Sequence, residues 1–140
     1  MAAYQKFNQF TDDLAKGKHD FSAHTYKIML TNVAPVSTNA VKADITDITS
    51  GNGYTAGGTA TSITLSNATG VEKVVASNVT FTASGGSIGP FRYAVMYNDT
   101  QTSPVKPLVN FFDYGSSVTL NSGETFTWTP DATNGLFTIG

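Results

Sequence analysis

The chain has 140 residues, a formal net charge of -2, 40% apolar residues and no cysteine. This length and apolar content fit one domain with its own core, and the lack of cysteine excludes disulfides and thiolate metal sites. Charged residues make up only 13%, so Thr, Ser, Asn and Gly must cover the surface, as in β-rich structural and extracellular proteins.

The N-terminal residues lack the continuous apolar segment of a signal peptide, and no window approaches the length of a membrane span. We therefore expect a protein that is made in the cytoplasm and either stays soluble there or leaves within a larger assembly. The weak net charge supplies no electrostatic argument for a nucleic-acid or membrane partner.

Residues 2–16 carry the one pattern that predicts a helix. Its apolar side chains recur at steps of three and four residues, forming a single stripe of Tyr4, Phe7, Phe10 and Leu14. Gly17 is placed to end the helix. The stripe has two interpretations: it packs on its own domain, or it docks on a neighbouring subunit as an arm. These four residues are therefore candidate interface residues, with residues 1–18 as the arm and residues 19–140 as the β domain.

The rest of the chain alternates short β-forming stretches with turn residues. This spacing predicts about eight strands, at residues 25–31, 59–66, 71–83, 91–97, 108–112, 117–120, 124–128 and 135–139. The predicted fold is mainly β: an antiparallel β-sandwich, jelly-roll-like, with a short N-terminal α-helix. Jelly rolls and other sandwiches are not separable at this point.

The stretch from Phe91 to Tyr97 is the longest nearly uninterrupted apolar and aromatic run. It is rich in β-formers and bounded by Gly89-Pro90 and Asn98-Asp99, so we expect a central strand buried on both faces. A bulge is expected near Ser77, where the apolar register of the preceding strand shifts. For residues 37–49 a short helix is favoured slightly over an extended segment.

Candidate catalytic and metal-binding residues are few. His19 and His24 could share a metal with Asp20, but no further ligand follows at a suitable spacing, and we expect both histidines in an exposed loop. The sequence therefore predicts no catalytic, cofactor-binding or metal-binding residues and no enzyme activity.

Arg92 is the only arginine and lies inside the central apolar run. Such a charge needs a partner or must reach solvent, and Asp99, Asp113 or a carboxylate of another subunit are the candidates. Tyr54 stands alone among glycines in the segment Gly51-Asn52-Gly53-Tyr54-Thr55-Ala56-Gly57-Gly58. It is the expected exposed aromatic anchor, so Tyr54 and Arg92 complete the candidate interface residues.

Three segments, TYKIMLTNVAPVSTNAVKADITDITSGNGYTAGG, FTASGGSIGPFRYAVMYNDT and FFDYGSSVTLNSGETFTW, together resemble a family of small structural proteins encoded by tailed bacteriophages. The blocks NGYTAGG and SGGSIGPFRYAVMYND are the most specific. The resemblance implies a capsid decoration or cement protein on the exterior of the virion, with the major capsid protein and further copies of itself, as a trimer, for partners. It implies no catalytic residues. The alternative is a tail or fibre module that binds a host receptor or glycan through residues 51–58 and 98–107.

Overall fold

The computed structural model describes residues 3–140 and is mainly β, with antiparallel sheets and one short α-helix, as predicted. The helix α1 spans Asn8–Ala15 and a short 3-10 helix, η1, spans Lys42–Asp44. The strands are β1 (Ala3–Lys6), β2 (Tyr26–Thr31), β3 (Thr59–Thr61), β4 (Ile63–Ala68), β5 (Val71–Ala76), β6 (Val79–Thr82), β7 (Ile88–Asn98), β8 (Leu108–Leu120), β9 (Thr125–Trp128) and β10 (Phe137–Ile139).

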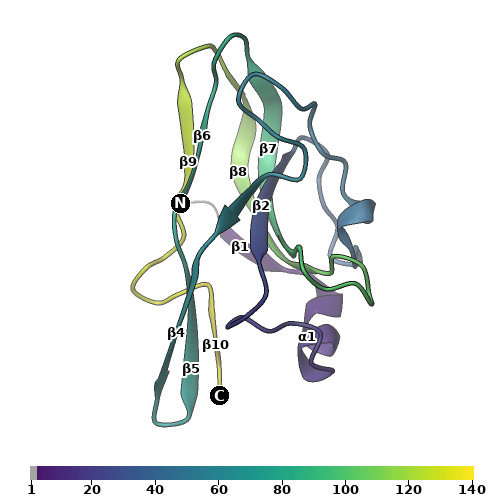
Figure 1. Ribbon diagram of the computed structural model, residues 1–140, viewed down its shortest axis with the longest axis vertical. Coiled ribbons are helices and arrows are strands. Elements are labelled where there is room, and N and C mark those ends of the chain that lie inside the picture. Colours follow the sequence, from purple (N-terminus) through teal and green to yellow (C-terminus); the bar gives the residue numbers. More distant parts are fainter. Residues whose placement is uncertain (1–2) are drawn as a thin grey trace.

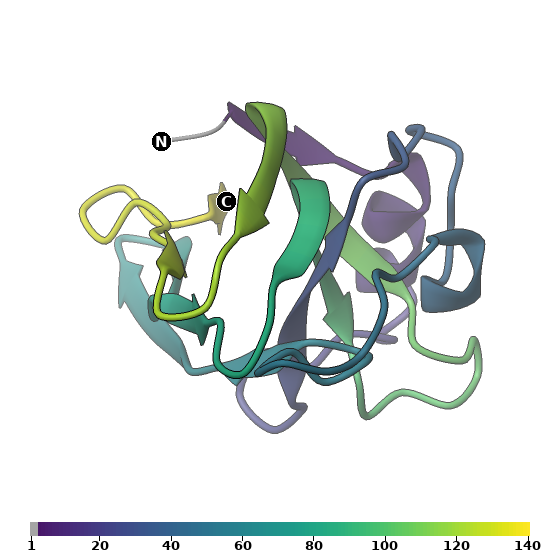
Figure 2. The same ribbon diagram turned by 90° about the horizontal axis from the view of Figure 1, so that it is seen from above.

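The strands form one large and two small sheets. The large sheet has the order β1-β8-β7-β2-β3, and the small sheets have the orders β10-β5-β4 and β6-β9. Figure 1 shows both small sheets along one side of the large sheet, with β6 and β9 towards one end and β4, β5 and β10 towards the other. Seen from above, the small sheets lie on one side of the molecule and α1 and the loops around η1 lie on the other (Figure 2).

The central position of the stretch from Phe91 to Tyr97 is confirmed, because it lies in β7 between β2 and β8. Ala94 and Met96 face the main core, whereas Val95 and Tyr97 belong to a second cluster on the opposite face. The strand is therefore buried on both sides, which explains why its sequence lacks the polar alternation of a half-exposed strand. β7 begins earlier than predicted, and its pairing with β8 is irregular between Ile88 and Phe91.

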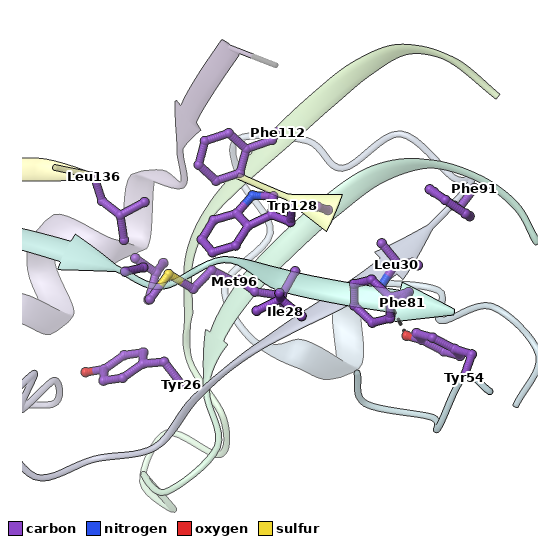
Figure 3. Packing of buried hydrophobic residues seen from close by; sticks show 14 of the residues in the cluster. Tyr26, Ile28, Leu30, Tyr54, Phe81, Phe91, Met96, Phe112, Trp128 and Leu136 are labelled. Atoms are coloured by element: carbon purple, nitrogen blue, oxygen red, sulfur yellow. Dashed lines mark hydrogen bonds between the residues drawn. The ribbon is translucent and has the colours of Figure 1, made fainter. Parts of the chain in front are cut away.

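The main core lies between the large sheet and the small sheets (Figure 3). Tyr26, Ile28 and Leu30 project from β2 into it, because every second side chain of a strand takes the same face. Trp128 of β9 packs edge-on against Phe112 of β8, with ring centroids 5.3 Å apart. The second cluster covers the opposite face of the large sheet with Phe7, Met29, Ile45, Val95, Tyr97, Leu108 and Phe111.

The N-terminal segment differs from the predicted continuous helix. Tyr4 lies in β1, which pairs with β8, and the helix begins only at Asn8. The chain turns at Phe7, whose extended backbone and fully buried ring anchor it in the second cluster. The spacing of three and four residues therefore did not describe one helical face. Tertiary burial of Phe7 outweighed the local helical pattern.

Two further expectations were wrong. The predicted strands at residues 108–112 and 117–120 are one strand, because β8 continues without a break and has 13 residues. Tyr114, in the middle of this strand, is 53% exposed. The expected bulge near Ser77 is instead the point where the chain leaves β5 and enters β6, which belongs to a different sheet. In the ambiguous region, a short helix does form as η1, where the Asp44 carboxylate accepts backbone N–H groups of Ala40 and Val41.

Candidate functional site

The predicted aromatic stripe does not form an exposed surface within the described chain. Phe7 is fully buried in the second cluster, and Phe10 is 3% exposed in the main core. Leu14 is partly buried and packs against the same core as Phe10. The side chain of Tyr4 lies outside what the structure describes. Phe7 and Phe10 therefore act as core residues, in agreement with the interpretation that the stripe packs on its own domain.

Tyr54 is not the exposed anchor that the sequence suggested, because only 2% of its surface is accessible. Its hydroxyl donates to Asp47 Oδ1 at 2.5 Å and accepts the backbone N–H of Leu30 at 3.1 Å (Figure 3 shows the contact with Leu30). Burial, and next the hydrogen bond to Asp47, raise the pKa of Tyr54 above its usual value. Glycine spacing could not reveal this burial, since the ring is covered by strands distant in sequence.

The two blocks most specific to the phage resemblance contact each other. Asn52 Nδ2 donates to the Ser87 carbonyl at 3.0 Å, and the Ser84 N–H donates to the Asn52 carbonyl at 2.9 Å. Gly53 has a positive φ of 105°, and a Cβ there would lie 2.1 Å from the Thr82 carbonyl oxygen. The glycines of this block thus permit close packing of two backbones. Residues 52–58 and 84–99 therefore form one contiguous structural unit.

Arg92 pairs within its own chain. Its Nε and Nη2 bind the two carboxylate oxygens of Asp113 at 2.8 and 3.1 Å. Asp113 was one of the three predicted partners, and the bidentate geometry is the expected one for guanidinium and carboxylate. The hydrogen bond from Arg92 lowers the pKa of the Asp113 carboxyl. Because the guanidinium already has this partner, an intersubunit ion pair is not needed to explain Arg92.

A buried polar network, which the sequence did not predict, lies where residues 18–26 meet the end of β7. The Nδ2 of Asn98 lies 2.8 Å from His24 Nδ1 and 3.4 Å from His19 Nδ1, and the Tyr26 hydroxyl lies 3.4 Å from both Asn98 Nδ2 and His19 Nδ1. His19 is only 7% exposed, so the expectation of an exposed loop histidine was wrong. Its ring lies among those of Phe10, Phe21 and Tyr26.

Burial lowers the pKa of His19 to about 4, and the nearby His24 contributes to the same direction. A neutral imidazole suits this apolar surrounding, since desolvation disfavours the charged form. Among the described residues no group of three or more His, Cys, Asp or Glu side chains is arranged to hold a metal ion. The network therefore has a structural explanation: it joins the loop before β2 to the end of β7.

A shallow hollow lies beside η1, with a volume of about 280 Å³. Its lining consists of Val41, Lys42, Ala43, Val105 and Lys106. Lys106 also forms an ion pair with Asp99, and Lys42 lies over the Tyr97 ring, 5.7 Å from its centroid. Both cations thus have partners of their own, and Val105, 60% exposed, is the exposed large apolar side chain of the hollow.

Exposed apolar side chains gather on the sheet of β10, β5 and β4. Leu65, Val71 and Ile139 are 38%, 43% and 42% exposed. Leu65 lies opposite the buried Val74 in the pairing of β4 with β5, and Ile139 lies opposite Glu72 in the pairing of β10 with β5. Leu65 and Ile139 thus lie on the face of this sheet that Val74 occupies, whereas Val71, opposite Ala68, lies on the other face. Figure 1 shows the hairpin of β4 and β5 projecting away from the large sheet.

No family model, curated protein or solved structure matches the chain. None of the helices in residues 3–140 has the length and apolar character needed to cross a membrane. The functional argument therefore depends on the resemblance that the sequence itself carries and on the surfaces that the fold exposes.

Proposed function

We propose that the protein is a structural component of a tailed-bacteriophage virion, bound to the exterior of the capsid shell through the major capsid protein and through copies of itself. The observation that carries the proposal is the resemblance to small phage structural proteins. Its two most specific blocks form one contiguous unit around Asn52 and Ser87. The likeness thus concerns the packed body of the domain rather than scattered surface positions.

The surface chemistry supports an assembly role. With only 13% charged residues, the protein meets its neighbours at a small cost in charge desolvation. Leu65 and Ile139 are exposed on the same face of the sheet of β10, β5 and β4, and exposed apolar groups that share one face are typical of protein–protein contacts. This hairpin and β10 replace the N-terminal stripe as the proposed contact surface, because Phe7 and Phe10 are already buried in their own domain.

Cryo-electron microscopy of the intact virion tests the proposal. Density for this fold at regular positions on the head lattice is the expected result, and its symmetry would identify the proposed trimer. Density at the tail, or none on the ordered head lattice, would refute the decoration role. The copy number per virion gives an independent check, since a lattice protein is present in hundreds of copies and a fibre in a few to a few tens.

A second candidate is a tail or fibre module that binds a receptor or glycan. The hollow between residues 41–43 and 105–106 supports this candidate, because it adjoins one of the loops predicted for recognition and exposes Val105. The other predicted loop loses its anchor, since Tyr54 is buried. Binding in a glycan array that is abolished by Val105→Asp would favour this function over decoration.

A further inference from the structure

The strand β4 has an edge that no other described strand covers. Within residues 3–140, β4 pairs with β5 alone, and it is the outer strand of its sheet. Edge strands usually avoid association through charged residues, proline or bulges. The sequence of β4, Ile63-Thr64-Leu65-Ser66-Asn67-Ala68, contains none of these residue types, and its pairing with β5 is regular throughout.

The orientation of the backbone groups shows which residues this edge offers. The Ser77 N–H donates to the Ser62 carbonyl at 2.9 Å, which anchors the alternation of bonded pairs between the two strands. In an antiparallel pair, every second residue directs both its N–H and its C=O to the partner strand. By this alternation Thr64 and Ser66 bond to β5, whereas the N–H and C=O of Ile63 and Leu65 point outwards, away from β5.

The side chains along this edge are symmetric about Thr64. Reading outwards in both directions, Thr64 is flanked by the apolar Ile63 and Leu65, and these are flanked by Ser62 and Ser66. An antiparallel pairing of two copies, centred on Thr64, therefore sets Ile63 opposite the second copy's Leu65 and serine opposite serine. The pairing brings no like charges together, because all five residues are uncharged.

We propose that two copies of the protein associate through β4, by antiparallel pairing about a two-fold axis at Thr64. This axis places Ile63 of one copy opposite Leu65 of the other. These are the two residues whose backbone N–H and C=O groups point outwards, so they can form the hydrogen bonds between the copies. The pairing joins two three-stranded sheets into one and covers Leu65, which is 38% exposed in the single chain. A single strand edge is smaller than a standard stable interface, so the dimer is weak in dilute solution. The inference does not depend on the virion proposal.

Disulfide trapping tests the proposed axis. The chain contains no cysteine, so Thr64→Cys forms only intermolecular disulfides. Opposite residues at such a position have Cβ atoms about 4.5–5.5 Å apart, close to disulfide geometry. Thr125→Cys is the matched control, because Thr125 is also an exposed strand threonine, on β9. We expect Thr64→Cys to form covalent dimers at least about tenfold faster than the control, owing to the local concentration of the thiols. Equal rates would overturn the proposal.

A second variant tests the interface without a covalent bond. Thr64→Lys sets two lysines opposite each other at the axis, while the exposed position leaves the fold intact. Sedimentation as a function of protein concentration should show self-association of the wild-type chain, its loss in Thr64→Lys, and its retention in Thr125→Lys. Self-association that Thr64→Lys leaves unchanged, or a wild-type chain that stays monomeric throughout, would also overturn the proposal.

Discussion

His19 should make the stability of the fold depend on pH between about 4 and 6.5, a window that lies mostly above the ordinary carboxyl pKa of 3.8. Burial holds its pKa at about 4 in the folded protein, compared with 6.5 for an unperturbed histidine. Between these values the unfolded chain binds a proton at His19 and the folded chain does not. The free energy of unfolding therefore rises with pH across this window.

The difference between 6.5 and about 4 corresponds to roughly 3 kcal/mol, at about 1.4 kcal/mol for each pH unit. We expect the wild-type protein to lose about this much stability between about pH 7 and pH 4. Carboxyls with a lowered pKa, such as those of Asp20 and Asp131, start from 3.8. Their stabilisation is fully present above about pH 5 and is lost progressively below it, so the part of the window above pH 5 reports His19, and the comparison with His19→Phe separates the two effects below it.

His19→Phe is the perturbation that isolates this effect. The new ring fits among Phe10, Phe21 and Tyr26, whose centroids lie 5.1, 5.9 and 6.0 Å from the His19 ring. The variant gives up only the 3.4 Å contacts of Nδ1 with Tyr26 and Asn98. We therefore expect stability close to that of the wild type at neutral pH, but little dependence on pH in the window.

Urea unfolding at several pH values gives the measurement. Trp128, the single tryptophan, is 4% exposed and reports unfolding by fluorescence. His24→Gln serves as the control and should keep most of the pH dependence, because burial is the larger cause of the His19 shift and His24 the smaller. The reasoning is refuted if His19→Phe and the wild type lose the same stability between pH 7 and pH 4.

Two further substitutions test features that the sequence did not reveal. Tyr54→Phe should destabilise the protein by about 1–3 kcal/mol in urea unfolding, because Asp47 and the Leu30 N–H lose their buried partner. The control Tyr114→Phe changes a side chain that is 53% exposed and should have almost no effect on stability. Equal losses of stability in the two variants would contradict the hydrogen bonds assigned to Tyr54. Gly58→Ala places a Cβ 1.8 Å from the Ile28 carbonyl oxygen and should cost at least about 4 kcal/mol or abolish soluble expression. Gly85 is the control: its φ of 77° is close to the 81° of Gly58, but a Cβ at Gly85 would have no atom within 4 Å, so Gly85→Ala should cost only about 1 kcal/mol of stability. A Gly58→Ala protein as stable as Gly85→Ala would show that the close packing of Gly58 against Ile28 is wrong.

The candidate site was less accessible to prediction than the fold. The sequence predicts Asp113 as one of the possible partners of Arg92, because an arginine within an apolar strand requires a carboxylate or solvent, and the structure confirms the pair. Tyr54 and His19 were both expected in exposed loops. Tyr54 lies next to Phe81, which is far away in the sequence. His19 is covered by the nearby Phe10, Phe21 and Tyr26, but these come together with it only when Asn98, also far away, closes the site. A local pattern contains no information about such neighbours.

The sequence by itself determined the fold class and the central strand. The run from Phe91 to Tyr97 has no regular polar alternation, which predicts burial on both sides, and Ala94, Val95, Met96 and Tyr97 are buried in this way while Arg92 and Tyr93 are half-buried. The alternation along β2 likewise showed that Tyr26, Ile28 and Leu30 share one face. These features are local, because the side-chain period of a strand is set by its own backbone.

Only the tertiary structure decided which strands pair and where the N-terminal segment lies. The spacing of Phe7 and Phe10 suits one helical face, yet Phe7 enters the second cluster while Phe10 enters the main core. A two-residue period shows which face a side chain takes but not which strand lies beside it. The division between β5 and β6, the continuity of β8 and the free edge of β4 therefore follow from packing between distant segments, which outweighs local preference.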